Sequence, residues 1–470
     1  MKYELIILGQ GAAAFAAAIK ANDLGIKTAM LGSNVTSGTL IGGTCVNVGC
    51  LPSKNLITVS TFFHKASSHS FEGIQYGKGK LNFKKVVEQK DKLVTKFRKD
   101  KYADVLMGLE HVDYIESLAK FVSKNEVKVD GRKLQGEKFL IATGARAYVP
   151  PVKGIEHIGY LTNEEALSLT ELPESLCVIG GRAVGLEFAQ MYAHFGVKVT
   201  VLQRSERILP ETEPEIAEAL AEYLEEEGID IFTGVNMRSV GKTKGKKVVH
   251  FTVDGKPQEV QADHILFATG RTPNTEMLDL GKAGVQLDER GFVKVNDEMQ
   301  TSVPHVWAAG DVIGEPMLET VAAKEGAIAV ENAFPQEKRK INFLEVPSAV
   351  FTYPEVASVG LTDAEAVANG IKCSCRTIPM SFVPKAHIIG DTRGLIKVVA
   401  ERETKRVVGV HILAPHAADL IHEATLAVKF RLTVDDIIDT VHVFPTLSEA
   451  IKLAAQSFYK EVDKLSCCVE

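Results

Sequence analysis

The sequence has few cysteines, no excess of positive charge and no long apolar run. Its seven cysteines are odd in number and sparse for 470 residues, which argues against a secreted disulfide framework. Lys and Arg total 54 against 60 Asp and Glu, so a nucleic acid or an anionic membrane is a disfavoured partner. No segment has the length to span a bilayer, and the N-terminus lacks the features of a signal peptide. These absences predict a cytoplasmic protein without membrane insertion.

Two segments share one plan, in which an apolar strand, a glycine turn and a helix follow one another. The turn positions that define the plan are Gly9, Gly11, Ala14, Gly180 and Gly185. In the second segment Arg182 replaces the middle glycine. Such a turn brings the chain from a strand into a helix whose N-terminus can bind a pyrophosphate. The sequence therefore predicts an α/β protein with two nucleotide-binding domains, each a doubly wound, Rossmann-like parallel sheet.

A chain of this length has room for about three domains. Two similar stretches, FLIATGARAYVP (139–150) and HILFATGRTPNT (264–275), flank the second unit, so the second domain is expected to be inserted in the first. From Phe343 on, apolar residues alternate as in antiparallel strands, and two helical stretches follow at 417–430 and 447–463. The predicted domains are residues 1–145 with 271–342, residues 146–270, and an α+β domain over 343–470.

The residues after the second strand of each unit determine whether the ribose of the bound nucleotide has a free 2′-hydroxyl or a 2′-phosphate. They are Gly32, Ser33 and Asn34 in the first unit and Gln203, Arg204 and Arg207 in the second. In the first unit Gly32 stands where a ribose-binding acid is expected, and either of the next two residues could replace that acid. In the second unit a neutral residue with two arginines suits a 2′-phosphate. We therefore expect NADPH rather than NADH in the second unit.

The most specific stretch is GGTCVNVGCLPSK, residues 42–54. Four residues separate Cys45 from Cys50, and the two glycines before them let the backbone come close to a ligand. Lys54 adds a positive charge that favours anions, including a thiolate. A thiol pair beside a bound cofactor can cycle between dithiol and disulfide. The stretch therefore predicts a redox-active pair.

These motifs, followed by the WAAGD segment (307–311) and the last domain, resemble the pyridine nucleotide–disulfide oxidoreductase family over the whole chain. The resemblance implies FAD in the first unit, with Cys50 facing the flavin and Cys45 exchanging with the substrate. It also implies that Lys54 and Glu187 pair beside the flavin ring. The remaining cofactor contacts that it implies are Gly43, Thr44, Ala119, Thr143, Gly144, Gly270, Asp311 and Val321.

The C-terminal run HVFPTLSEA departs from the disulfide reductases of this family. Those enzymes carry a histidine before the proline, whereas Phe444 precedes Pro445 here. Thiol–disulfide exchange needs a proton donor for the leaving thiol, and losing a positioned donor costs about 10²–10⁴ in rate. His442 is expected to be hydrogen-bonded in place rather than catalytic, which leaves Glu449 without an imidazole partner.

The last residues, KLSCCVE, place Cys467 next to Cys468, too close for an unstrained disulfide within the pair. A soft cation such as Hg(II) needs thiolates and two electrons but no proton, so it suits a chain with two dithiols that lacks that histidine. The combination resembles the mercury-reducing branch of the family, which implies a homodimer whose tail thiols serve the partner's site. We expect thiol-bound Hg(II) to pass from the tail to Cys45 and Cys50, beside Tyr102, for reduction by FAD and NADPH.

Two alternatives remain open at this point. One is a disulfide reductase whose tail dithiol relays electrons to thioredoxin or to a small disulfide. The other is a non-enzymatic protein that binds soft metals through its thiols. Phe444 argues against the first alternative, and the presence of Lys54 and Glu187 argues against the second.

The other cysteines are assigned to the framework. Cys177 lies in an apolar strand and is expected to be a core residue. Cys373 and Cys375 are expected to lie on one face of a strand, with no further ligand near them.

Overall fold

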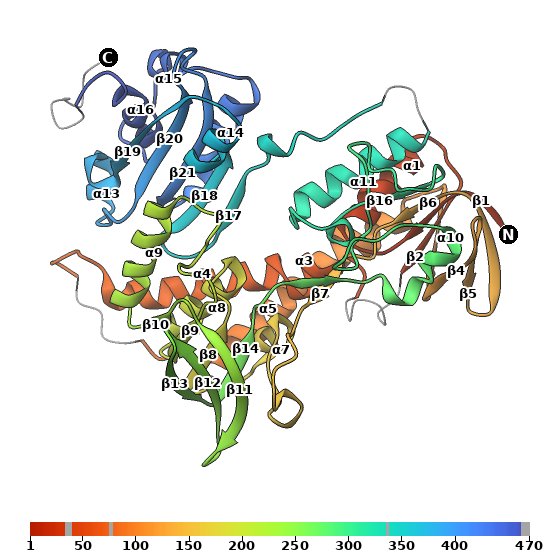
Figure 1. Cartoon of the computed structure of the whole chain (residues 1–470), viewed down its shortest axis with the longest axis horizontal. Helices are drawn as coiled ribbons and strands as arrows, with labels where there is room; N and C mark the ends of the chain where they lie inside the picture. Colours follow the sequence, from red (N-terminus) through yellow and green to blue (C-terminus); the bar gives the residue numbers. More distant parts are fainter. Residues whose placement is uncertain (33–39, 75–78, 335–337, 462–470) are drawn as a thin grey trace.

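The computed structural model describes residues 1–32, 40–74, 79–334 and 338–461, and it has three parts (Figure 1). The first part, on the right of Figure 1, is built around β1 and β6, the second, at the bottom, around β8 and β9, and the third, at the upper left, contains the last strands and helices. The long helix α4 (Cys50–Ser68) extends along the second part and packs against α8 (Ala183–His194). None of the helices in these ranges has both the length and the apolar composition of a membrane span.

The first part contains a seven-stranded sheet in the order β3-β2-β1-β6-β5-β4, with β16 paired to β6. Its strands are β1 (Lys2–Leu8), β2 (Thr28–Gly32), β3 (Val112–Glu116), β4 (Ala119–Ser123), β5 (Glu126–Val129), β6 (Arg132–Ile141) and β16 (Val306–Ala308). The pairs among β1, β2, β3, β6 and β16 are parallel, whereas β4, β5 and β6 form an antiparallel meander. The chain leaves this sheet after β6 and returns at β16, so the predicted insertion of one domain in the other is confirmed.

Two helices pack against each other beside this sheet. α1 (Ala12–Asp23) buries Ala14, Ala17, Ala18 and Ala21 completely, and α11 (Glu319–Ala333) lies against it. A Cβ at Gly326 would lie 2.0 Å from the Ala13 carbonyl oxygen. The small residues therefore set how closely the two helices approach, and that approach fixes where α11 begins.

The second part repeats the parallel plan in a four-stranded sheet with the order β10-β9-β8-β14. Its strands are β8 (Ser175–Ile179), β9 (Lys198–Leu202), β10 (Asp230–Phe232) and β14 (His264–Phe267), with α9 (Pro214–Glu226) and the antiparallel strands β11 (Asn236–Thr243), β12 (Lys246–Val253) and β13 (Lys256–Ala262). A Cβ at Gly185 would lie 1.9 Å from the Gly180 carbonyl oxygen. Glycine is required there because α8 begins directly against the turn. Cys177 is buried on β8, so its predicted place in the core is confirmed.

The two chain crossings between these parts lie side by side. β7 (Ala145–Ala147) pairs antiparallel with β15 (Arg271–Pro273). The Thr143 hydroxyl donates to the Asn274 carbonyl at 2.8 Å, and the Asn274 amide donates to the Thr143 carbonyl at 3.0 Å. The two similar sequence stretches therefore meet each other in space.

The third part is a five-stranded antiparallel sheet in the order β17-β18-β21-β20-β19. Its strands are β17 (Ser348–Val350), β18 (Glu355–Gly360), β19 (Cys373–Pro379), β20 (Leu395–Glu401) and β21 (Val407–Ala414), covered by α14 (Ala417–Lys429), α15 (Val434–Asp439) and α16 (Glu449–Gln456). The predicted helix over 447–463 is too long, because the Ser457 carbonyl, just after α16, accepts a hydrogen bond from Arg376 Nε at 2.9 Å.

The remaining helices and helical turns are α5 (Phe83–Arg98), α6 (Asp104–Met107), α7 (Asn163–Ser168), α10 (Leu280–Ala283), α12 (Asp363–Ala368), α13 (Pro384–Ile388) and the 3₁₀ turns Ile155–His157, Glu276–Leu278, Asp311–Ile313, Phe343–Glu345 and Met380–Phe382.

Candidate active site

Cys45 and Cys50 lie on two consecutive helices that dock on the first glycine turn. Cys45 is in α3 (Gly43–Val48), and Cys50 is the first residue of α4. A Cβ at Gly43 would lie 2.6 Å from Gly11 Cα, so this close approach requires glycine. The Gly42 amide also donates to the Gln10 carbonyl at 2.9 Å. The two sequence motifs therefore form one site.

The two thiols are unequal. Both are free thiols, with Cys45 half-buried and Cys50 exposed. The hydrogen bond from Cys45 lowers the pKa of Cys50 to about 7, although protein around the thiol group displaces water from it and opposes this shift; the charge of Lys54 lowers the pKa further. The same hydrogen bond, followed by burial, raises the pKa of Cys45 far above its usual value. The pair therefore keeps its thiolate on Cys50 and its proton on Cys45. Which thiol faces the flavin and which exchanges with the substrate stays a prediction.

Glu187 connects the three parts of the molecule beside this pair. Lys54 Nζ on α4 lies 2.7 Å from Glu187 Oε2 on α8, and the Glu187 side chain is 5% exposed. Glu187 Oε1 accepts the backbone N–H of Phe351 at 3.0 Å, and Lys54 Nζ lies 4.6 Å from the centre of the Phe351 ring. The structure thus brings together the two residues that the resemblance paired.

Tyr102 lies near the dithiol, on a π-helical turn (Lys99–Ala103) that follows α5. Its ring packs edge-on against Phe15, with the centroids 4.9 Å apart. Burial raises the pKa of Tyr102 to about 12, and negative charge at Cys45 and Glu319 adds to the rise. Glu319, the first residue of α11, also raises the pKa of both cysteines. The sequence reasoning missed Glu319, because the only signal was an acid in the first turn of a helix.

The residues around α1 fit the pyrophosphate of FAD. Among the described residues, no side chain caps the N-terminus of α1 and no acid lies in its first turn. Gly9 has φ +145°, and a Cβ there would lie 2.1 Å from the Ala142 carbonyl oxygen, so the turn needs glycine. Backbone amides at an uncapped helix N-terminus are suitable donors for phosphate oxygens.

Asp311 and Thr44 lie close together around Arg271. Arg271 Nε lies 3.3 Å from Asp311 Oδ2, and its Nη2 donates to Thr44 Oγ1 at 3.4 Å. Burial raises the pKa of Asp311, while the charge of Arg271 opposes that rise. Burial likewise raises the pKa of Glu325 to about 7, and Glu325 Oε2 accepts the N–H of Gly310 at 2.7 Å. Arg271 and Glu325 were not predicted, although the Gly-Arg step after β14 was a usable signal for the arginine.

The other predicted cofactor positions are distributed over this part. Thr143 and Gly144 lie where β6 ends, and Gly270 lies at the second crossing, with φ +70° for Gly144 and +117° for Gly270. Ala119 is buried on β4 and Val321 is buried on α11. Their contacts with a bound nucleotide remain predictions.

Gly32 has a structural reason for lacking a side chain. A Cβ there would lie 2.3 Å from Gln10 Oε1, an atom that also accepts the Tyr114 hydroxyl at 2.8 Å. Gln10 thus occupies the place where an acid at position 32 would begin. The proposed substitutes Ser33 and Asn34 lie outside the described residues.

The three residues predicted to recognise a 2′-phosphate do different things. Gln203 is buried, and its Oε1 accepts the Gly181 N–H at 2.8 Å. Arg207 Nη2 donates to the Pro210 carbonyl at 2.9 Å, so Gln203 and Arg207 hold the turn together. Arg204 is exposed. The preference for NADPH remains a prediction, which depends most on Arg204.

No imidazole stands before Pro445, and the nearby histidine is engaged elsewhere. His442 Nε2 lies 2.8 Å from Glu423 Oε1, and its Nδ1 lies 3.0 Å from the Thr440 carbonyl oxygen. Phe444 is 54% exposed. Glu449 Oε2 accepts the Thr446 N–H at 3.2 Å. His442 is therefore held in place by two partners, as predicted.

The structure describes only one of the two remaining pairs of cysteines. Cys467 and Cys468 lie outside the described residues. Cys373 and Cys375 do lie on one face of β19, where both contact the cluster of Leu361, Ala366 and Val399. The expectation that no further ligand lies near them is wrong, because Cys373 Sγ is 3.1 Å from Asp363 Oδ1. Asp363 is ten residues away, at the start of α12, where sequence spacing gave no signal.

The fold and site define a flavoprotein oxidoreductase, in which two dinucleotide folds adjoin a redox-active dithiol. The chain belongs to the pyridine nucleotide-disulphide oxidoreductase family, whose model matches residues 3–326. The family's dimerisation domain matches residues 346–455, which supports a homodimer. The protein therefore uses FAD together with a pyridine nucleotide, and the residues around α1 and α8 remain the predicted binding residues.

Individual relatives are similar over almost the whole chain. A mercuric reductase of Lysinibacillus sphaericus is 42% identical, over 99% of this chain and 84% of the relative. A mercuric reductase of Staphylococcus aureus is 41% identical with the same coverage, and a dihydrolipoyl dehydrogenase of Thermus scotoductus is 38% identical over 98% of each chain. The solved structure of the HOCl-induced flavoprotein disulfide reductase RclA from Escherichia coli has a TM-score of 0.86 and 28% identity, over 97% of this chain and 100% of that one.

Alkylation of Cys50 in the reduced protein is expected to accelerate with pH around a midpoint of about 7, because only the thiolate reacts. Replacing Lys54→Met removes a positive charge and should move the midpoint to higher pH. Lys54→Arg keeps the charge and should move it less. Iodoacetamide rates between pH 5 and 9, with peptide mapping of the labelled thiol, measure the effect. An unmoved midpoint in Lys54→Met, or first labelling at Cys45, contradicts the assigned electrostatics.

Proposed function

We propose that this protein reduces Hg(II) to elemental mercury with electrons from NADPH and so detoxifies mercury in the cytoplasm. The observation that supports this most is a thiolate-bearing dithiol with no imidazole before Pro445. A disulfide substrate needs a proton for each leaving thiol, whereas a metal ion does not. The similarity to mercuric reductases over 99% of the chain supports the same assignment.

Thiolate exchange would deliver the ion. Hg(II) arrives with two small thiolates, and the partner subunit's Cys467 and Cys468 replace them one at a time. Cys50 and Cys45 then displace those tail sulfurs in the same way. At the tail, each incoming thiol passes its proton to the small thiolate that leaves. At the inner pair, Cys50 enters as a thiolate and Cys45 passes its proton to one of the two departing tail sulfurs, so charge and protons balance. The ion is never free in solution on this route.

Residues around the pair would control the charge of the bound complex. Bound FAD supplies two electrons that originate from NADPH. Lys54 supplies positive charge beside Cys50, and Glu187 fixes the position of Lys54. Tyr102, with a pKa of about 12, keeps its hydroxyl proton and offers a neutral polar group. Two electrons convert Hg(II) to a neutral atom that thiolates no longer hold.

A disulfide reductase is the second candidate function, because a dihydrolipoyl dehydrogenase and RclA are also similar to this chain. One assay separates the two functions: NADPH oxidation with Hg(II) in excess thiol, compared with oxidation by thioredoxin or a small disulfide. We expect the Hg(II) rate to exceed the disulfide rate by about 10² or more, the low end of what a missing proton donor costs. Efficient disulfide reduction without Hg(II) reduction would refute the proposal. A purified protein without bound flavin would instead favour a non-enzymatic thiol protein.

A further inference from the structure

We propose that Cys373, Cys375 and Asp363 form a second metal site, which takes a thiophilic divalent cation. The two cysteines project from one face of β19, because residues two apart on a strand share a face. Asp363 is the first residue of α12 and stands over that face. The ligand atoms of the three side chains all lie within 4.8 Å of one another. This inference does not rest on the proposed function.

The ligand atoms of the three side chains are close enough to bind one shared ion. Two thiolates bound at about 2.3 Å to a tetrahedral, zinc-like ion lie about 3.8 Å apart. Ligand atoms that lie within 4.8 Å of one another therefore need to move by only about 1 Å to share one ion. Thiolate sulfur selects soft cations, and the carboxylate oxygen adds a third donor. Three protein donors leave one position of a tetrahedral ion open for water or a thiol. An ion held in this way can exchange with solvent thiols.

The elements that carry the ligands are rigid. β19 pairs with β20 along its whole length, from Cys373 to Pro379. α12 begins with a capping box between Thr362 and Glu365, and the Asp363 N–H donates to Glu213 Oε1 at 2.6 Å. Ligands on paired strands and capped helices are better positioned than ligands on loops. The three donors are therefore held in place before an ion arrives.

In the metal-free cluster two of the three ligands already contact each other, because the Cys373 thiol donates a hydrogen bond to Asp363 Oδ1 at 3.1 Å. A divalent ion would take the place of the two thiol protons while the carboxylate stays ionised. Binding therefore releases two protons for each ion, and the bound cluster has one net negative charge.

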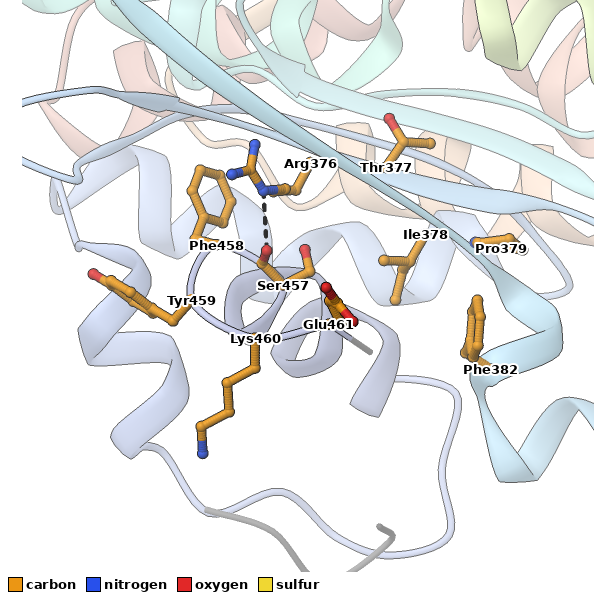
Figure 2. A pocket seen from close by; sticks show the side chains of 10 residues that line it. All are labelled: Arg376, Thr377, Ile378, Pro379, Phe382, Ser457, Phe458, Tyr459, Lys460 and Glu461. Atoms are coloured by element: carbon orange, nitrogen blue, oxygen red, sulfur yellow. Dashed lines mark hydrogen bonds between the residues drawn. The ribbon is translucent and has the colours of Figure 1, made fainter. Parts of the chain in front are cut away.

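The site is separate from the place where the chain's last described residues lie. Arg376 and Ile378, on the other face of β19, line a hollow of about 620 Å³ together with Ser457 and the residues up to Glu461 (Figure 2). Ile378 belongs to the core under α16, whereas Cys373 and Cys375 contact Ala366 on the α12 side. The metal ligands therefore face α12 and not the hollow.

Cadmium binding to the full-length, FAD-loaded protein tests the site. The background is Cys45→Ala/Cys50→Ala/Cys467→Ala/Cys468→Ala, which removes the four cysteines of the proposed mercury route and leaves the buried Cys177 beside the two proposed ligands. We expect one Cd(II) per chain by equilibrium dialysis, with a sulfur-to-cadmium charge-transfer band in the ultraviolet. Cys373→Ser/Cys375→Ser should abolish both signals, and Asp363→Asn should weaken binding by about tenfold or more. Ser374→Ala, between the two ligands on the strand, should leave binding unchanged.

Retention of FAD absorbance and of the thermal unfolding midpoint shows that each variant is folded. The proposal is overturned if the Cys373→Ser/Cys375→Ser variant still shows the charge-transfer band and still binds one Cd(II) per chain. It is also overturned if the background protein binds no Cd(II). Neither result bears on Hg(II) reduction, because no turnover is measured. Failure of this site and failure of the proposed function are therefore distinguishable.

Discussion

Replacing Cys45 or Cys50 with alanine is expected to lower Hg(II)-dependent NADPH oxidation by more than about a thousandfold, the scale of loss when one member of a catalytic unit is removed. A single thiolate cannot hold Hg(II) as a two-coordinate complex beside the flavin. The Cys50 substitution also removes the thiolate that the Cys45 hydrogen bond stabilises. Steady-state NADPH consumption with thiol-complexed Hg(II) measures the effect.

Two further measurements make that result specific. Reduction of bound FAD by NADPH should remain fast in both variants, because α8 and its glycine turn are untouched. Cys177→Ala removes a buried core thiol and should keep its turnover. Turnover within a few fold of the parent in Cys45→Ala or Cys50→Ala would show that the ion is reduced elsewhere.

The second large effect is expected from Cys467→Ala/Cys468→Ala. Tethered thiols raise the local concentration of a ligand near the inner pair, and such tethering is worth about 10²–10⁴ in apparent affinity. Removing them should slow turnover of thiol-complexed Hg(II) by about a hundredfold while FAD reduction by NADPH stays intact. Ser466→Ala, the neighbouring residue in the tail, serves as the matched control. Unchanged turnover in the double variant would remove the tail from the delivery route.

Much of the framework was predictable from local patterns. The glycines of both turns are required by close approaches of under 2.5 Å at Gly9, Gly180 and Gly185, so their spacing reports backbone geometry directly. The alternation around Cys373 and Cys375 placed both on one strand face, as found. These signals are strong because each depends on residues within one turn or one strand.

The parts that the sequence did not predict depend on contacts between distant residues. Asp363 reaches the β19 cysteines from another element, Arg271 joins Thr44 to Asp311, and Glu319 acts on the dithiol through its charge. Arg207 and Gln203 hold their own turn, although their types suggested phosphate recognition. Residue type and spacing do not distinguish a side chain that binds a ligand from one that binds backbone.

Both carboxylate oxygens of Glu187 have a partner, one in Lys54 and the other in the backbone N–H of Phe351, and this limits how the molecule can move. Its three parts cannot slide past one another without breaking the Lys54–Glu187 ion pair or the hydrogen bond from the Phe351 N–H to Glu187. Rotation of a whole part as a rigid body, to make room for the nicotinamide ring, is therefore unfavourable. Rearrangement of a single side chain breaks neither of these two contacts, and that is the kind of motion to look for during turnover.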